Sequence, residues 1–490
     1  MTLLEVRKVH SNESTEKKVL ARFLFSKKVW ASLLAISLFV GMYVGLPESY
    51  HLSARLMIGI VSGAIVLWAL EPIPLGLTSI LTIIFMILFN VVSTEVVYSG
   101  FASPAVFLII AGMMLARAVN ETPLVKRITY FILAKWGGNA KGLLASILLI
   151  LQIQAFFIPA VAVRTALLLP IVVNVLDMIK AKPKSDLRKM LMLGVAFGST
   201  ISGTAIMTAA IGNILAVELL NEFTGNNITY FQWFLYALPI WLILIPAVWI
   251  LLLKLFPLEK EESVFPEVQI QMRERAKDFG KMNSSEKGCL IILIFIVGVW
   301  MTEPLHGLHP SIPALIAVAL MALPKIGCAS WSNVVKINFD TVIMIGATLS
   351  IGYALNESGA TRLLGESLSA GWIISLMENP IIAVIFILCI TQLLHLAMSN
   401  VSTAVVVLIP IYIGLANQAG TDPLVIVFSA ALACLHGYIL VVEAMPNIIV
   451  HSTGQIKQQS FLLPGFYMTL IMTGVTVIVA LTWWQWIGLL

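Results

Sequence analysis

The sequence reads WALEP at residues 68–72. A similar motif, WMTEP, occurs at residues 300–304, which is 232 residues further along the chain. Three more matches follow in the same order and with nearly the same spacing. They are AVNE at 118–121 with ALNE at 354–357, Gln152 and Pro170 with Gln392 and Pro410, and Gly212-Asn213 with Pro446-Asn447. One such match could arise by chance, but four in order indicate two copies of one structural plan.

The two copies lie in a chain that is too apolar to be a water-soluble protein. Of its 490 residues, 59% are hydrophobic and 11% are charged, and the mean hydropathy is +0.97. Soluble domains carry about 25% charged residues. The hydrophobic runs reach the roughly 20 residues that a bilayer-crossing helix needs, and none has the alternation of a membrane β-barrel. We therefore predict an all-α polytopic membrane protein with about 11 transmembrane helices plus two re-entrant hairpins in two repeats.

The positions of Lys and Arg predict how the chain is oriented. With the N-terminus in the cytoplasm, 26 of the 30 basic residues fall on the inner face, as the positive-inside rule requires. The net charge of +5 then belongs to the inner surface, so no nucleic-acid partner is expected. We expect a multi-pass protein of the cell membrane with its C-terminus outside. In this topology the two copies are inverted relative to each other, which is typical of secondary transporters.

Four segments follow from this topology. Residues 1–28 form a cytoplasmic tail, and residues 29–257 hold the first copy with one preceding helix and a hairpin at 142–178. A polar linker at 258–287 joins it, on the cytoplasmic side, to the second copy at 288–490, whose hairpin lies at 380–415.

Polar or helix-breaking residues interrupt both hairpins, at 158–160 and 398–403, and the helices that follow them, at 200–213 and 443–447. Polar backbone at membrane depth is tolerated where it lines a cavity, and free helix N-termini there attract anions. Simple packing kinks are the alternative explanation for any single interruption. We expect the substrate site to include Arg164, Thr165, Thr208, Asn213, Thr403, Pro446 and Asn447.

Several of these motifs resemble the divalent anion/sodium symporter (DASS) family. They are EPIPL at 71–75, SNV at 399–401 with Pro410, and PNIIV at 446–450 followed by GQI at 454–456. The resemblance implies transport of dicarboxylates, citrate, sulfate or related anions by an elevator-type mechanism in a homodimer. It also implies that the second hairpin tip, with Ser399, Asn400 and Val401, binds substrate, and that Ser399, Asn400 and Asn447 could hold a sodium ion.

The first hairpin tip departs from the family pattern of Ser-Asn-Thr. Its equivalent here is Pro159-Ala160-Val161, which offers no side-chain ligand, so sodium coupling is in doubt at this position.

Two charges stand near the altered positions, Arg164 after the first turn and Glu443 before the second break. Charges at membrane depth cost about 2.5–3.5 kcal/mol and need a partner or a function. We expect Arg164 to supply positive charge that a cation would otherwise provide and to pair with an anionic substrate, and Glu443 to serve in coupling. The alternatives are a structural ion pair between the two or an Arg164 that reaches the cytoplasm.

His395, one turn before the second tip, and His436 in a late helix could also titrate, although a buried histidine is more often simply hydrogen-bonded.

The function that these features favour is secondary active transport of a small, dicarboxylate-like organic anion, by sodium-independent exchange or linked to protons. A sodium-coupled dicarboxylate or sulfate symporter is the first alternative, and an inorganic ion antiporter or channel-like permease is the second. An enzyme is disfavoured because the sequence has no nucleophile–base set, metal-ligand spacing or Walker motif, and no enzyme cofactor is expected.

Overall fold

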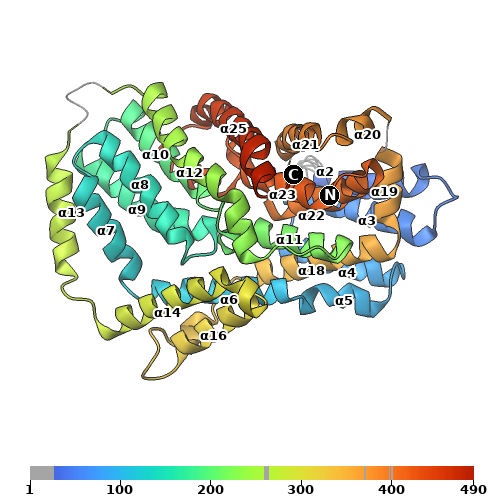
Figure 1. Cartoon of the computed structure of the whole chain (residues 1–490), viewed down its shortest axis with the longest axis horizontal. Helices are drawn as coiled ribbons and strands as arrows, with labels where there is room; N and C mark the ends of the chain where they lie inside the picture. The colour runs from blue at the N-terminus through green and yellow to red at the C-terminus, as the bar shows by residue number, and fades with distance from the viewer. Residues whose placement is uncertain (1–26, 259–263, 369–370, 397, 399–400) are drawn as a thin grey trace, which may run out of the picture.

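The computed structural model describes residues 27–258, 264–368, 371–396, 398 and 401–490 (Figure 1). Over these residues the chain is helical, without β-strands. Nine of the described helices are long and apolar enough to cross a membrane, or ten when one bent pair is counted as a span. The all-α polytopic prediction is confirmed.

Twelve elements precede the linker. They are α2 (Lys27–Gly45), α3 (Leu52–Leu70), α4 (Leu75–Leu88), α5 (Thr94–Ala102), α6 (Pro104–Asn120), α7 (Leu124–Trp136), α8 (Ala140–Ala155), α9 (Val161–Met178), α10 (Asp186–Ile201), η1 (Met207–Ala209), α11 (Ile211–Thr224) and α12 (Tyr230–Leu255). Figure 1 shows α7 to α10 and α12 gathered at one end of the molecule, with α3, α4 and α5 at the other.

The linker contains α13 (Pro266–Asp278), and the remaining elements follow it. They are α14 (Ser284–Met301), α15 (Glu303–His306), α16 (Ser311–Ala322), α17 (Trp331–Val334), α18 (Phe339–Glu357), α19 (Ala360–Leu368), α20 (Gly371–Met377), α21 (Pro380–His395), α22 (Val401–Ala419), α23 (Pro423–Leu435), η3 (Val441–Glu443), α24 (Met445–Ser452), α25 (Gln459–Val479) and η4 (Ala480–Trp484).

Both hairpins have the same construction. In the first, α8 and α9 meet at a turn over residues 156–160, and in the second α21 and α22 meet near residues 396–400, of which 396 and 398 are described. Each second arm contains a proline at an equivalent place, Pro170 in α9 and Pro410 in α22. The axis bends by 117° between α20 and α21, where Pro380 begins α21.

The two helix breaks also match atom by atom. The Asn213 side-chain amide donates to Gly203 O at 2.8 Å and points to Ile206 O at 3.5 Å. The Asn447 amide donates to Gly437 O and to Leu440 O, both at 3.1 Å. A constant offset of 234 residues relates the two sets, which supports the internal repeat. Each asparagine pairs carbonyls that a regular helix would have satisfied, as an interrupted helix at membrane depth requires.

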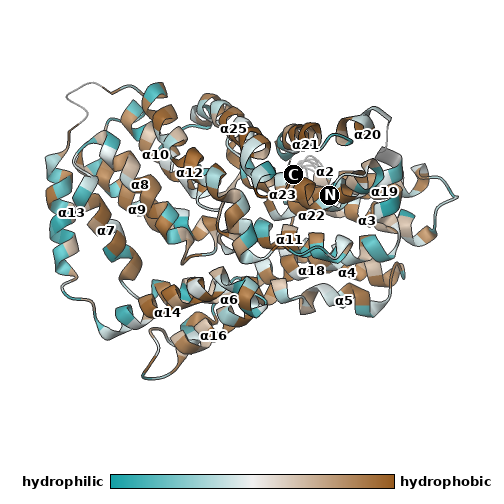
Figure 2. Ribbon diagram, viewed as in Figure 1, coloured by the Kyte–Doolittle hydropathy of each residue, from teal (hydrophilic) through white to brown (hydrophobic). Residues whose placement is uncertain are grey.

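The linker helix α13 is polar along most of its length, as its teal colour in Figure 2 shows, and packs against α7. Arg127 of α7 holds the chain that follows α13. Its guanidinium bonds to the Glu286 carboxylate at 2.8 and 3.1 Å and to the backbone oxygens of Gly280 and Phe279 at 2.8 and 3.1 Å. These bonds fix the linker to the first copy.

A close backbone contact joins α5 to α18. A methyl group at Gly100 would overlap the Ser350 N and the Gly346 O, so the two helices can approach this closely only with glycine at residue 100.

Substituting Gly100→Ala should therefore lower the thermal unfolding midpoint of the detergent-purified protein, because the backbone of α18 must move. Overpacking of this kind costs about 1–3 kcal/mol. Gly41→Ala, at a helical position with no neighbour within 4 Å, is the matched control and should leave the midpoint unchanged or raise it. Equal midpoints for both variants would contradict the proposed contact.

Asn447→Asp should destabilise the protein by about 2 kcal/mol or more, since it replaces a donor with a buried acceptor that faces Gly437 O and Leu440 O. Asn226→Asp, in an exposed turn, should have little effect. Thermal unfolding of both variants measures the difference, and a stable Asn447→Asp protein would rule out the bridging role.

Candidate functional site

The Arg164 side chain is fully buried in the first turn of α9, beside the first break. Its Nε donates to Ser202 Oγ at 3.0 Å, and its Nη1 donates to Ala209 O at 3.0 Å and also to Ile158 O. Among the described residues no carboxylate forms an ion pair with Arg164. The structure therefore contains no ion pair between Arg164 and Glu443, which was the alternative explanation for these charges. Its remaining nitrogen, Nη2, is buried and has no hydrogen-bond partner within the described part of the chain.

The three oxygens around Arg164 come from three separate segments. Ile158 O belongs to the hairpin turn just before Pro159, Ala209 O ends η1, and Ser202 Oγ follows the last residue of α10. Each lies where the helix ladder is interrupted, so these oxygens are free to accept from a side chain. The break therefore forms an oxygen cage, and the guanidinium occupies it.

The Glu443 carboxylate is buried in the second break and is also held by backbone. It accepts from Ile439 N at 3.0 Å and from Leu440 N at 2.9 Å. Pro446 and Asn447 lie in the first turn of α24, and both are buried. The Oδ1 atoms of Asn213 and Asn447 are buried and have no hydrogen-bond partner among residues that the structure describes.

The second hairpin tip reaches the first break. A methyl group at Gly212 would lie 2.7 Å from Val401 Cγ1, so Val401 packs on the residue that precedes Asn213. Thr403 is buried in the same first turn of α22. Ser399 and Asn400 lie outside the described residues. The chain thus brings the second tip and the first break together, as the predicted site requires.

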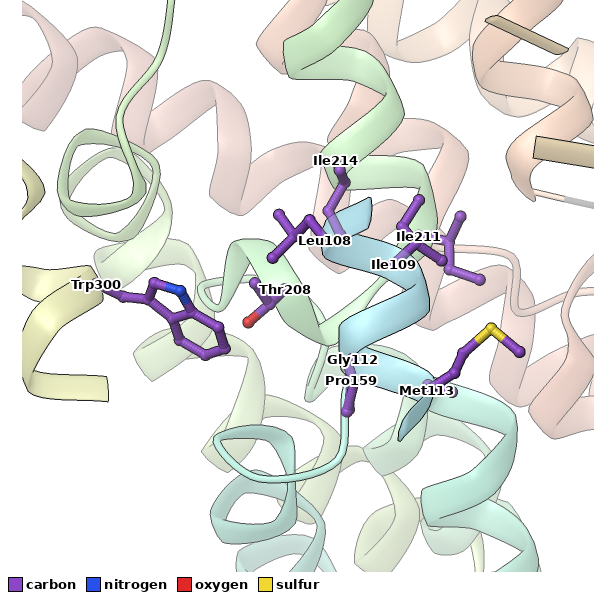
Figure 3. Close-up of a pocket in the computed structure, with 10 residues that line it drawn as sticks. Leu108, Ile109, Gly112, Met113, Pro159, Thr208, Ile211, Ile214 and Trp300 are labelled. Atoms are coloured by element: carbon purple, nitrogen blue, oxygen red, sulfur yellow. The ribbon is translucent and has the colours of Figure 1, made fainter. Parts of the chain in front are cut away.

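Two further predicted residues have different surroundings. The Thr165 hydroxyl donates to Val161 O at 2.9 Å, within its own helix. Thr208 lines a small cavity of about 20 Å³ together with Gly112, Pro159 and Trp300 (Figure 3). A space of this size holds about one water molecule. The first tip closes this cavity, because a methyl group at Gly112 of α6 would lie 2.8 Å from Pro159 Cγ.

Two histidines complete the second break. His395 ends α21 with both ring nitrogens buried and without a hydrogen-bond partner in the described structure. His436 follows α23, with Nε2 3.0 Å from Thr204 Oγ1 of the first break. In the first copy the repeat-equivalent positions of His395 and His436 are Ala155 and Ser202. The sequence therefore shows that neither histidine is shared by the two copies.

Known proteins resemble the chain over nearly its whole length. A family model described as the sodium:sulfate symporter transmembrane region matches residues 26–490. A protein of Cupriavidus necator described as a membrane protein is 24% identical over 485 residues, covering 94% of this chain and 93% of that protein.

Two named transporters are also similar. The sodium-dependent dicarboxylate transporter SdcS of Staphylococcus saprophyticus is 25% identical over 434 residues, which cover 84% of this chain and 82% of SdcS. An uncharacterized transporter of Haemophilus influenzae is 25% identical over 435 residues, covering 86% and 89% of the two chains. The chain therefore belongs to the sodium:sulfate symporter transmembrane family, the DASS family that its motifs resemble, and is a multi-pass membrane transporter and not an enzyme.

Proposed function

We propose that this transporter carries a small, dicarboxylate-like organic anion by secondary active transport, through sodium-independent exchange or linked to protons. The observation that carries the proposal is the guanidinium of Arg164 in the oxygen cage of the first break. Carbonyl and hydroxyl oxygens suit a small hard cation. A cation that is covalently part of the chain takes this place, so no sodium ion is needed at the first hairpin.

The geometry of the guanidinium also suits an anionic substrate. Of the five N–H donors that an arginine presents, those on Nη2 have no partner in the described ranges. A guanidinium binds carboxylates through paired N–H groups more strongly than a neutral donor does. The substrate-binding set is then Arg164, Thr208 and Asn213 from the first half, with Ser399, Asn400, Val401, Thr403, Pro446 and Asn447 from the second. Thr165 supports the first turn of α9 through its bond to Val161 O.

The elevator-type movement is proposed from the family resemblance. The cavity at Thr208 holds about one water and is otherwise lined by apolar residues, so it does not by itself admit a dicarboxylate. Family resemblance leads us to propose a homodimer as well. The positions of the basic residues support a cell-membrane protein with a cytoplasmic N-terminus and an external C-terminus.

A sodium-coupled dicarboxylate or sulfate symporter is the second candidate. Two observations favour it: SdcS is described as sodium-dependent, and the Oδ1 of Asn447, which has no hydrogen-bond partner among the described residues, is an oxygen that could bind a cation. In that case a sodium ion would bind at the second hairpin.

Counterflow in liposomes distinguishes these candidates. Purified protein is reconstituted into vesicles loaded with succinate, and uptake of radiolabelled succinate is followed with choline or with sodium outside. We expect uptake without sodium, because Arg164 supplies the positive charge of the first site. Strict dependence on sodium would favour the symporter instead.

Arg164→Ala should reduce sodium-free counterflow by about tenfold or more, since charge-assisted hydrogen bonds contribute about 1.5–3 kcal/mol each. Sodium should restore part of the rate, because the substitution leaves Ile158 O, Ala209 O and Ser202 Oγ free to bind it. Arg362→Ala is the matched control, since Arg362 is exposed and pairs with Glu366 on the same helix. Full sodium-free transport by folded Arg164→Ala protein would exclude the proposed role.

A further inference from the structure

The second hairpin and break hold two histidines and a glutamate, whereas the first break holds no histidine and no charged side chain. His395, His436 and Glu443 correspond, through the repeat offsets of 240 and 234 residues, to Ala155, Ser202 and Ala209. Two of those first-half residues, Ser202 and Ala209, supply the oxygens that hold Arg164. His395, His436 and Glu443 therefore occupy, in the second half, positions that are equivalent by the internal repeat to those around Arg164 in the first half.

His395 and Glu443 meet at a glycine. A methyl group at Gly437 would lie 2.9 Å from His395 Cε1 and 2.7 Å from Glu443 Cβ, so both side chains pack against this residue. His395 is 1% exposed, and within the described structure neither of its ring nitrogens has a hydrogen-bond partner. A buried polar group without a partner is costly to keep and usually has a function.

His436 can be satisfied in two protonation states. Its Nδ1 lies 2.7 Å from Leu432 O, which can only accept, so Nδ1 carries a hydrogen. Its Nε2 lies 3.0 Å from Thr204 Oγ1, and that hydroxyl lies 2.7 Å from Ile201 O. The Thr204 hydroxyl can donate to Nε2 of a neutral ring. It can instead donate to Ile201 O and accept from Nε2–H of a charged ring, so rotation of one hydroxyl accommodates an added proton.

The charges of the two breaks leave room for one more cation. Among the described residues at the tips and breaks, Arg164 and Glu443 carry opposite formal charges that cancel. A doubly charged anion in this region would remain uncompensated, which is unfavourable in a medium of low dielectric constant. The described parts of the elements packed against α21 and α23 contain no Lys or Arg. Their other titratable groups are Cys389 on α21, Tyr412 on α22, Cys434 on α23, Tyr438 in the break, Tyr467 on α25, and Glu218 and Glu222 on α11.

We propose that the second half binds a proton on the His395–His436 pair, beside Glu443, and that this proton crosses the membrane with the anionic substrate. The inference rests on the proposed function, and it assigns the coupling ion of the same site. The proton comes from water on the side where substrate binds and returns to water on the other side, so no further reactant is needed. A positively charged histidine pair would also repel a sodium ion from this position.

Calorimetry of succinate binding to the intact protein counts the protons directly. At about pH 7.5 both succinate carboxylates are ionised, so the protein is the source of any proton exchange with buffer. Binding heats in two sodium-free buffers of different ionisation enthalpy should reveal uptake of about one proton per succinate. The measurement uses the wild-type protein and does not depend on the folding of a variant.

Transport by variants then locates the proton. With a pH-sensitive dye inside the vesicles, wild-type protein should move protons together with succinate, and His395→Gln and His436→Gln should lose most of this movement. Both variants should still exchange succinate, because counterflow needs no net proton transfer, but with weaker succinate binding, because the site has lost one positive charge. His51→Gln, at an exposed histidine outside the cluster, should behave as wild type.

The outcomes separate the two proposals. Sodium-free succinate counterflow without proton uptake in either measurement would overturn the proton site and leave the proposed function intact. Wild-type proton movement by His395→Gln and His436→Gln would overturn the assignment to these residues. Absence of succinate binding and counterflow would overturn the proposed function, and the coupling proposal with it.

Discussion

The interrupted helices can exist only because the protein itself pairs the backbone groups that each interruption frees. Lipid offers no hydrogen bonds, so a break at membrane depth needs partners from its own chain. Asn213 and Asn447 meet this need in the same way, each bridging across a break through its side-chain amide. The hairpin tips and the surrounding helices are arranged around these two breaks. The candidate site consists of residues at the tips and the breaks.

On this common frame the two halves carry opposite charges. The first hairpin turn and the first break have oxygens to spare, and Arg164 donates to three of them. The second break has N–H groups to spare, and Glu443 accepts from two of them. Each charge is therefore stabilised by local dipoles and not by the other charge. This arrangement lets a substrate interact with either charge without first breaking an ion pair.

The sequence predicts where the hairpins and breaks lie better than it predicts which groups form hydrogen bonds with the charged residues there. Prolines, glycines and asparagines at membrane depth mark the hairpins and breaks, because such residues interrupt a helix whatever surrounds it. The partners of Arg164 lie 6 to 45 residues away, so they depend on how α9 packs against the first break. A sequence shows two opposite charges and suggests an ion pair; it does not show the backbone groups that satisfy both. The same limit applies to Thr165, whose hydroxyl bonds within its own helix.

The placement of these bonds also bears on how the site could open. The bonds of Arg164, Glu443 and the two asparagines all lie within the hairpins and breaks, so they can stay formed when these segments move together. The contact that closes the first tip against α6, between Pro159 and Gly112, is apolar. Separating these two residues breaks van der Waals contacts and no hydrogen bond between them. Bonds that lie inside the hairpins and breaks need not break when these segments move as one body, and this supports the elevator-type movement proposed above.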